Sequence, residues 1–215
     1  MSIITNFEKI KQEIKNNSFQ NETEIIAVSK TFSIEHIMPL VEHGHKHFGE
    51  NKVQEAEKKW KELKKSTNDL SLHMIGRLQS NKAKKAVELF DFIHSLDSEK
   101  LADELSKRQK EKDRNLGYFI QINLGSEEQK GGLEISELKN FNEYCVNKLN
   151  LSVLGLMAIP PNDKNAEKHF KRISELNKEF NFRYLSIGMS NDYLQAVKYG
   201  ASHVRIGSAI FGTRS

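Results

Sequence analysis

Short apolar segments alternate with longer amphipathic segments along almost the whole chain. The short segments are rich in β-branched and aromatic residues, which is typical of buried strands. They predict strands over residues 25–29, 45–48, 70–75, 92–95, 118–124, 152–159, 184–187 and 203–206. In the longer segments apolar residues recur at helical spacing, which predicts helices that pack one face on a core. These helices cover residues 34–43, 51–63, 80–89, 99–112, 136–149, 166–180 and 192–199, and one more, 3–15, precedes the first strand.

The number and order of these elements predict the fold. Eight strands alternate with seven helices; such alternation makes the strands parallel, and eight units can close on themselves. We therefore predict a single α/β domain over residues 1–215, a (β/α)8 TIM barrel with an extra N-terminal helix. The alternative is an open doubly wound sheet, which usually has a glycine-rich turn after its first strand. The corresponding turn here, residues 29–32, contains no glycine.

Composition and charge narrow the class of protein. The chain has a single cysteine, Cys145, which excludes a disulfide framework and a multi-cysteine metal site. No apolar run reaches the roughly 18 residues of a membrane span, and the first residues lack the pattern of a signal peptide. The net charge is only +4, and lysines alternate with glutamates in residues 55–62, as on a solvated helix face. We expect a cytoplasmic protein that binds neither nucleic acid nor membranes.

Candidate chemistry is sought where the predicted strands end, because barrel proteins carry their functional residues at the carboxyl ends of the strands. Lys30 directly follows the first strand. Its stem would be packed there, and desolvation favours the neutral amine that Schiff-base chemistry needs. Spacing alone favours the simpler interpretation, a surface lysine among many.

The last two strands end in a pattern suited to an anion. Ser190 follows Gly188 at the start of a predicted helix, and Gly207 and Ser208 follow the eighth strand. Backbone N–H groups at such turns bind phosphate. Arg205 alternates with apolar residues and could point into the barrel mouth. The alternatives are a plain helix cap for Ser190 and an exposed strand charge for Arg205.

Three other features have simpler explanations. The histidines of residues 43–47 resemble a zinc site, but they fall at the start of a strand, the end of a barrel that usually serves stability. Cys145 lies among apolar residues of a predicted helix and is expected to be buried. Lys130 lies in a glycine-rich loop and could reach the barrel mouth, although a solvated lysine is the simpler interpretation.

Several segments together resemble the pyridoxal phosphate homeostasis family, the YggS/PROSC-type proteins. They occur in order from the first strand to the C-terminus, and their combination is highly specific. The matching segments are Ala27-Val28-Ser29-Lys30-Thr31, Phe48-Gly49-Glu50-Asn51 with Gln54-Glu55, His73-Met74-Ile75-Gly76 with Leu78-Gln79-Ser80-Asn81-Lys82, Gly155-Leu156-Met157-Ala158-Ile159, Leu185-Ser186-Ile187-Gly188-Met189-Ser190 with Asp192, and Val204-Arg205-Ile206-Gly207 through Ile210-Phe211-Gly212 to Arg214.

The resemblance implies a cofactor and a site. The family is related to the N-terminal barrel of alanine racemase, the third fold type that binds pyridoxal 5′-phosphate (PLP). By this resemblance Lys30 forms a Schiff base with PLP, and Arg205 faces the pyridine nitrogen, which weakens PLP as an electron sink. The other expected cofactor-binding residues are Asn51 in the pocket wall and Ser190, Gly207 and Ser208 at the phosphate. Arg77 stands where the family often has proline, and Ser208 where it often has threonine.

The resemblance also implies a function without turnover. The family holds PLP and is implicated in keeping free PLP low and supplying PLP-dependent enzymes, so we expect a PLP-homeostasis protein, with apo enzymes as partners and no catalytic or metal-binding residue. A monomer is expected. One alternative is a PLP-dependent amino-acid racemase, which would carry a second domain with a tyrosine base; the chain ends at Ser215, after its eighth strand. The other is a metal-dependent barrel hydrolase, which rests only on the histidines of residues 43–47.

Overall fold

The barrel predicted from the strand and helix pattern is confirmed. A computed structural model of the chain describes residues 2–18, 22–67, 69–125, 131–161 and 165–212. Within these residues, eight parallel strands pair in chain order and close into a barrel, since β1 also pairs with β8. The strands are β1 Glu24–Val28, β2 His47–Glu50, β3 Ser71–Met74, β4 Phe92–Leu96, β5 Gly117–Ile122, β6 Ser152–Ala158, β7 Tyr184–Met189 and β8 His203–Ile206.

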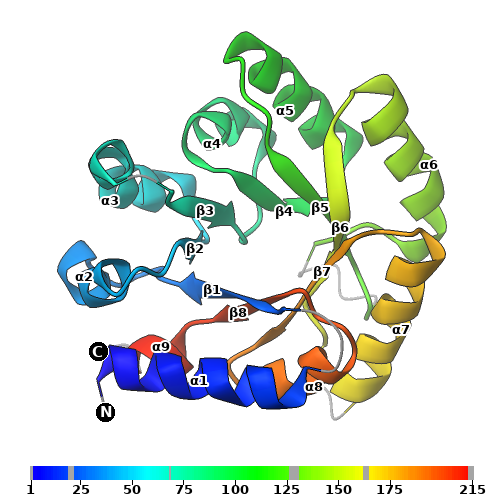
Figure 1. The fold of residues 1–215 in the computed structure, drawn as a ribbon. Helices are drawn as coiled ribbons and strands as arrows, with labels where there is room; N and C mark the ends of the chain where they lie inside the picture. Colours follow the sequence, from blue (N-terminus) through cyan, green and yellow to red (C-terminus); the bar gives the residue numbers. More distant parts are fainter. Residues whose placement is uncertain (1, 19–21, 68, 126–130, 162–164, 213–215) are drawn as a thin grey trace.

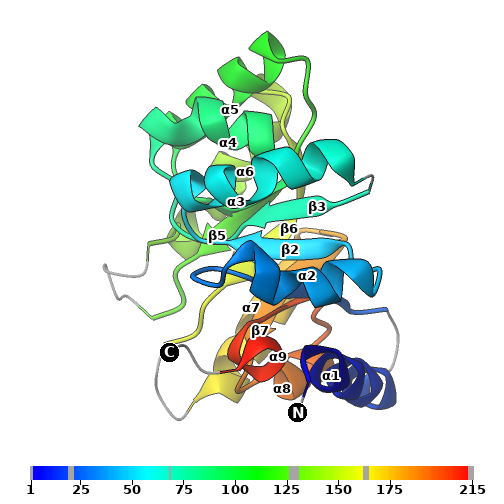
Figure 2. The ribbon, with the colours of Figure 1, turned by 90° about the vertical axis from the view of Figure 1, so that its left-hand side faces the viewer.

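Helices surround the barrel (Figure 1). They are α1 Ile3–Asn17, α2 Ile34–Glu42, α3 Val53–Ser66, α4 Ala83–Leu89, α5 Glu99–Glu111, α6 Leu138–Glu143, α7 Ala166–Glu179, α8 Tyr193–Lys198 and α9 Ser208–Phe211, with shorter 3₁₀ turns at Ser80–Lys82 and Ile135–Glu137 and a π-helical turn at Tyr144–Lys148. The expected extra N-terminal helix is α1, which lies beside α8 and α9 (Figures 1 and 2). Its buried residues Phe7, Ile10 and Ile14 recur at helical spacing and pack on the hydrophobic core. None of the described helices is long and apolar enough to cross a membrane.

Strand β2 begins two residues later than the sequence pattern predicts. Gly44 ends α2 with a φ of +90°, a conformation that glycine adopts without strain. The next N–H, that of His45, donates to the Leu40 carbonyl at 3.2 Å, so the chain remains tied to the end of the helix. The ladder therefore starts at His47, and Gly49 and Glu50 lie inside the strand rather than after it.

The outer layer of the core is apolar, whereas part of the barrel interior is polar. Between strands and helices, buried apolar side chains such as Trp60 and Phe48 pack with ring centroids 4.8 Å apart. Cys145 is fully buried in this layer, as expected. His94 of β4 and Ser186 of β7 come from strands that are not neighbours, yet they lie 2.9 Å apart. Both side chains therefore point into the barrel, where the sequence pattern had predicted only buried strands.

Candidate functional site

A cavity of about 760 Å³ opens at the carboxyl ends of the strands. This volume lies within the range of roughly 300–1,000 Å³ that small-molecule sites occupy. Its wall is formed largely by residues at or just after the carboxyl ends of β1, β2, β3, β6, β7 and β8. All six residues expected to bind a cofactor line it: Lys30, Asn51, Ser190, Arg205, Gly207 and Ser208. The structure thus brings together side chains that lie up to 178 positions apart in the sequence.

The loop that carries Lys30 is anchored by hydrogen bonds to a buried carboxylate and its lysine partner. Glu50 is fully buried, and its Oε1 accepts hydrogen bonds from Ser29 Oγ at 2.7 Å and from Trp60 Nε1 at 2.9 Å. Lys59 Nζ donates to the same oxygen at 2.9 Å and to the Ser29 carbonyl at 2.7 Å. Ser29, the residue before Lys30, is thus tied to Glu50 through its hydroxyl and to Lys59 through its carbonyl, and these bonds fix the backbone from which the lysine extends into the cavity.

For Lys59 the prediction of a solvated helix face is wrong. Its side chain is only 7% exposed, because the helix turns this lysine toward the carboxylate of β2. Other members of the run behave as predicted: the side chain of Glu62 is 79% exposed. The alternation of charges gives no sign of a buried partner; the neighbouring Trp60, an apolar position in the run, is the available signal for an inward-facing turn.

Asn51 is placed by a close backbone approach. Gly76, just after β3, packs so tightly on Asn51 that a Cβ atom on the glycine would lie 2.4 Å from the Asn51 carbonyl oxygen. Only glycine allows this approach without movement of the loop. Arg77, which departs from the family pattern, is exposed and is not among the cavity residues. Lys130 lies outside the described residues.

The interpretation of Ser190 as a helix cap is wrong. The cap position of α8 belongs to Asp192, whose Oδ1 accepts from the Met189 N–H at 2.6 Å. Ser190 Oγ instead accepts from the N–H groups of Gly207 at 3.3 Å and Ala209 at 3.4 Å, across the cavity edge in the segment after β8. Two backbone donors and a hydroxyl therefore meet at one point, an arrangement that suits an anion such as phosphate.

Arg205 is a buried cation in the cavity wall, not an exposed strand charge. It is 4% exposed, and its Nη1 donates to the carbonyl oxygen and to Oγ of Ser186, at 2.7 and 2.8 Å. Its Nη2 donates to the Ala158 carbonyl at 2.9 Å. Burial lowers the pKa of the guanidinium to about 10, and the Asp192 carboxylate opposes this shift. The side chain is still charged at neutral pH and can donate to an acceptor in the cavity.

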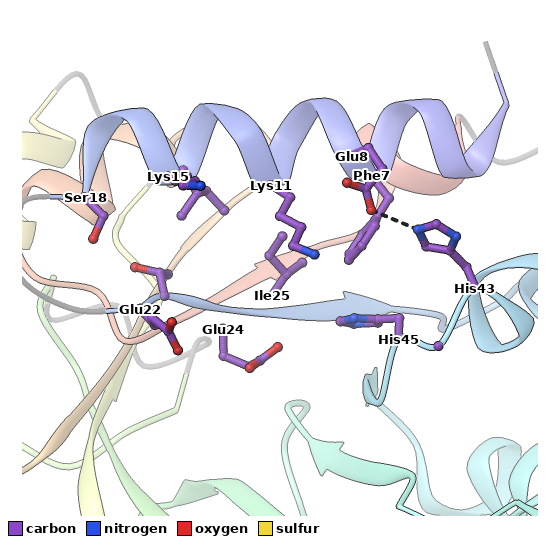
Figure 3. Close-up of a pocket in the computed structure, with 13 residues that line it drawn as sticks. Phe7, Glu8, Lys11, Lys15, Ser18, Glu22, Glu24, Ile25, His43 and His45 are labelled. Carbon is purple, nitrogen blue, oxygen red and sulfur yellow. Dashed lines mark hydrogen bonds and ion pairs between the residues drawn. The ribbon is translucent and has the colours of Figure 1, made fainter.

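The histidines of residues 43–47 lie at the opposite end of the barrel, where the sequence placed them. His43 and His45 border a second cavity of about 780 Å³ between α1, the start of β1 and the loop that precedes β2 (Figure 3). His43 Nε2 lies 2.8 Å from Glu8 Oε1, and His45 Nε2 lies 2.8 Å from the His47 carbonyl. Burial lowers the pKa of His45 to about 4. Within the described ranges, no group of three or more histidine, cysteine or acidic side chains could hold a metal ion.

Comparison with known proteins identifies the family. The family described as alanine racemase, N-terminal domain, matches residues 2–215. A protein of Aquifex aeolicus named pyridoxal phosphate homeostasis protein is 41% identical over 204 residues, covering 91% of this chain and 89% of that protein. The chain belongs to the pyridoxal phosphate homeostasis family.

Solved structures agree with this membership. PipY of Synechococcus elongatus, solved with PLP bound, is 32% identical, with a TM-score of 0.89 over 98% of this chain and all of PipY. Alanine racemase of Bartonella henselae shares the fold of the family at 16% identity, with a TM-score of 0.76. The alignment covers 98% of this chain but only 58% of the racemase chain. The expected relation to the alanine racemase barrel, fold type III, is confirmed.

Proposed function

We propose that this protein binds PLP as a Schiff base on Lys30 and serves in intracellular PLP homeostasis. The observation that carries the proposal is the convergence of three kinds of group on one cavity. PLP presents an aldehyde, a phosphate and a pyridine nitrogen, and the cavity offers an amine, a set of hydroxyl and amide donors, and a guanidinium. Its relatives support the proposal by the printed name of the Aquifex protein and by the PLP bound to PipY.

Each residue has a proposed role. The Lys30 amine would hold the cofactor covalently, since PLP supplies an aldehyde that condenses with a lysine amine. The phosphate would be bound by Ser190, Ser208 and the Gly207 N–H. Asn51 would form part of the pocket wall beside the pyridine ring. Arg205 would donate a hydrogen bond to the pyridine nitrogen, because a guanidinium cation has donors but no acceptor. The ring nitrogen would then stay unprotonated, which favours holding the cofactor over using it as an electron sink.

We further propose that the protein performs no turnover and delivers PLP to apo enzymes as a cytoplasmic monomer. The titratable side chains among the described cavity residues are Lys30, Asp192 and Arg205. Asp192 Oδ1 accepts from the Met189 N–H, and Arg205 remains protonated. Racemisation needs an acid and a base on opposite faces of the substrate carbon, and this set offers only Lys30 for that work.

Absorption spectroscopy tests the covalent role of Lys30. The protein incubated with PLP should show a visible band that borohydride bleaches while fixing the label to the chain. Lys30→Ala should lose both the band and the label, whereas Lys46→Ala, at the opposite end of the barrel, should keep them. A wild-type protein that stays colourless after PLP is added would refute the proposal.

Three further assays test the remaining roles. Ser190→Ala should weaken the binding of PLP more than that of pyridoxal, which lacks the phosphate; equal weakening would argue against a phosphate contact. Incubation with L-alanine should yield no D-alanine above a no-protein control, and robust conversion would favour the racemase alternative. When an apo PLP-dependent enzyme is mixed with the PLP-loaded protein, the enzyme should gain activity and the visible band of the PLP-loaded protein should fade.

A further inference from the structure

A row of hydrogen-bonded side chains crosses the barrel interior behind Arg205. Ser186 Oγ, which accepts from Arg205, lies 2.9 Å from Nδ1 of His94. His94 Nε2 lies 2.9 Å from His73 Nδ1, and His73 Nε2 lies 3.0 Å from Nδ1 of His47. We call Ser186, His94, His73 and His47 the histidine chain. It joins the cavity at the carboxyl ends of the strands to the opposite end of the barrel.

The far end of the histidine chain meets a carboxylate. His47 Nε2 lies 3.8 Å from Glu24 Oε2, a separation at which the carboxylate acts through its charge. Both side chains are partly exposed, His47 at 25% and Glu24 at 43%. Glu24 lines the cavity at that end together with Glu22, and Figure 3 shows the two carboxylates along the start of β1, across the cavity from α1.

The donors and acceptors give the histidine chain a direction. The two central rings are fully buried, and burial holds the pKa of His73 and of His94 well below the ordinary value, so each is neutral, with one donor and one acceptor nitrogen. Arginine can only donate, so Ser186 Oγ accepts from Arg205 and its own hydrogen is free to go to Nδ1 of His94. Each ring then carries its proton on Nε2 and passes a hydrogen bond to the next ring.

The groups at both ends of the histidine chain favour this same direction of the hydrogen bonds, from Arg205 toward Glu24. In this order His47 Nε2–H points toward the Glu24 carboxylate. In the reverse order a bare His47 nitrogen would face that carboxylate, and Ser186 Oγ would accept twice and keep an unused hydrogen. A run of hydrogen bonds with one polarity is also strengthened by mutual polarisation in a medium of low dielectric.

Arg205 has no direct carboxylate partner among the residues that the structure describes; its hydrogen bonds go to two carbonyls and a hydroxyl. A buried cation without compensation is costly. The Asp192 carboxylate acts on the guanidinium through its charge from the cavity side. On the interior side, the polarised row of rings that ends at Glu24 adds to this compensation.

We propose that Glu24 is a second, remote counter-charge of Arg205, coupled to it through the one-way hydrogen bonds of the histidine chain. Glu24, His47, His73 and His94 are then positioning residues: they hold the guanidinium charged and aimed at the cavity without touching anything bound there. The proposal concerns the protein without ligand and stands apart from whether the cavity takes PLP.

Nuclear magnetic resonance of the ¹⁵N-labelled full chain, without ligand and at neutral pH, tests the direction. Long-range correlation spectra of the imidazole rings should place the proton of His73 and His94 on Nε2 and leave Nδ1 bare. A proton on Nδ1 of either ring would overturn the proposal, because the polarity from Arg205 to Glu24 would be broken.

Matched variants test the coupling. Glu24→Gln removes the charge without changing the shape, and Glu22→Gln makes the same change two residues away, off the histidine chain. We expect Glu24→Gln to change the ¹⁵N chemical shifts of the His94 ring, although residue 24 does not touch His94. We also expect it to speed hydrogen exchange of the Arg205 guanidinium several-fold. Glu22→Gln should leave both quantities at their wild-type values. In a His47→Gln background, Glu24→Gln should have no further effect. Equal responses to the two glutamate variants, or an undiminished Glu24→Gln effect without His47, would overturn the coupling.

Discussion

Replacement of Lys59 by methionine should destabilise the protein far more than its place in a lysine-rich helix suggests. Lys59 Nζ lies 2.9 Å from Glu50 Oε1, and the two side chains are 7% and 0% exposed. At an effective dielectric of 20 their attraction is about 6 kcal/mol. Part of this is offset by the desolvation of lysine that the variant no longer incurs, so we expect Lys59→Met to lower the free energy of unfolding by about 3–5 kcal/mol, the range for breaking a buried pair.

Urea denaturation followed by circular dichroism measures this loss. With a slope of roughly 2 kcal/mol per molar urea, the midpoint should fall by about 1.5–2.5 M. The matched control is Lys61→Met, an exposed position on the same helix, which should change stability by less than about 0.5 kcal/mol. Glu50→Leu combined with Lys59→Met should recover part of the loss, because no unpaired charge stays buried. If Lys59→Met and Lys61→Met differ by less than about 1 kcal/mol, the buried pair does not stabilise the loop that carries Lys30.

The remaining predictions concern pH, backbone space and thiol reactivity. Burial lowers the pKa of His203 from its ordinary 6.5 to about 4, so its contribution to stability is complete above pH 6.5 and is lost as the pH falls through 4. The loss is roughly 3 kcal/mol by pH 4; His203→Phe should flatten the fall in urea midpoint between pH 7 and pH 4, and an unchanged slope would contradict the assignment. Gly76→Ala must push the Asn51 carbonyl away from its Cβ and should cost roughly 1–3 kcal/mol, with weaker PLP binding; a thermal midpoint equal to wild type would refute the tight contact. Burial raises the pKa of the Cys145 thiol to about 12, so a disulfide reagent should label it only after unfolding; rapid labelling of the native protein would show that the thiol is accessible.

The fold could be predicted from the sequence because the relevant signal is local. Apolar runs and amphipathic segments set the number and order of the elements, and parallel closure follows from alternation. The start of β2 could not be predicted in the same way. It depends on the hydrogen bond from His45 to Leu40, which no count of hydrophobic residues contains.

The candidate site also has a part that local sequence signals predict and a part that they do not. Lys30, Arg205 and the segment 207–208 follow from the rule that function lies at the carboxyl ends of barrel strands, and the structure places them on one cavity. Their roles toward PLP stay predictions. The burial of Lys59 and the histidine chain could not be predicted. Whether a polar side chain in a helix or strand is solvated or buried depends on a partner that lies on another element. His73 and His94 lie within strand patterns that indicate burial but not which buried groups meet.

Because β1 pairs with β8, the cavity is assembled only once β8 has been synthesised. Lys30 follows the first strand, and Arg205 belongs to the last, where it pairs in register with Ile26. A chain emerging from the ribosome presents Lys30 early, but the guanidinium and the donors of residues 207–209 arrive only with the final strand. No intermediate that lacks β8 can carry the assembled cavity. A ligand that needs residues beside both β1 and β8 therefore binds only closed barrels, and in binding stabilises them against opening between β1 and β8.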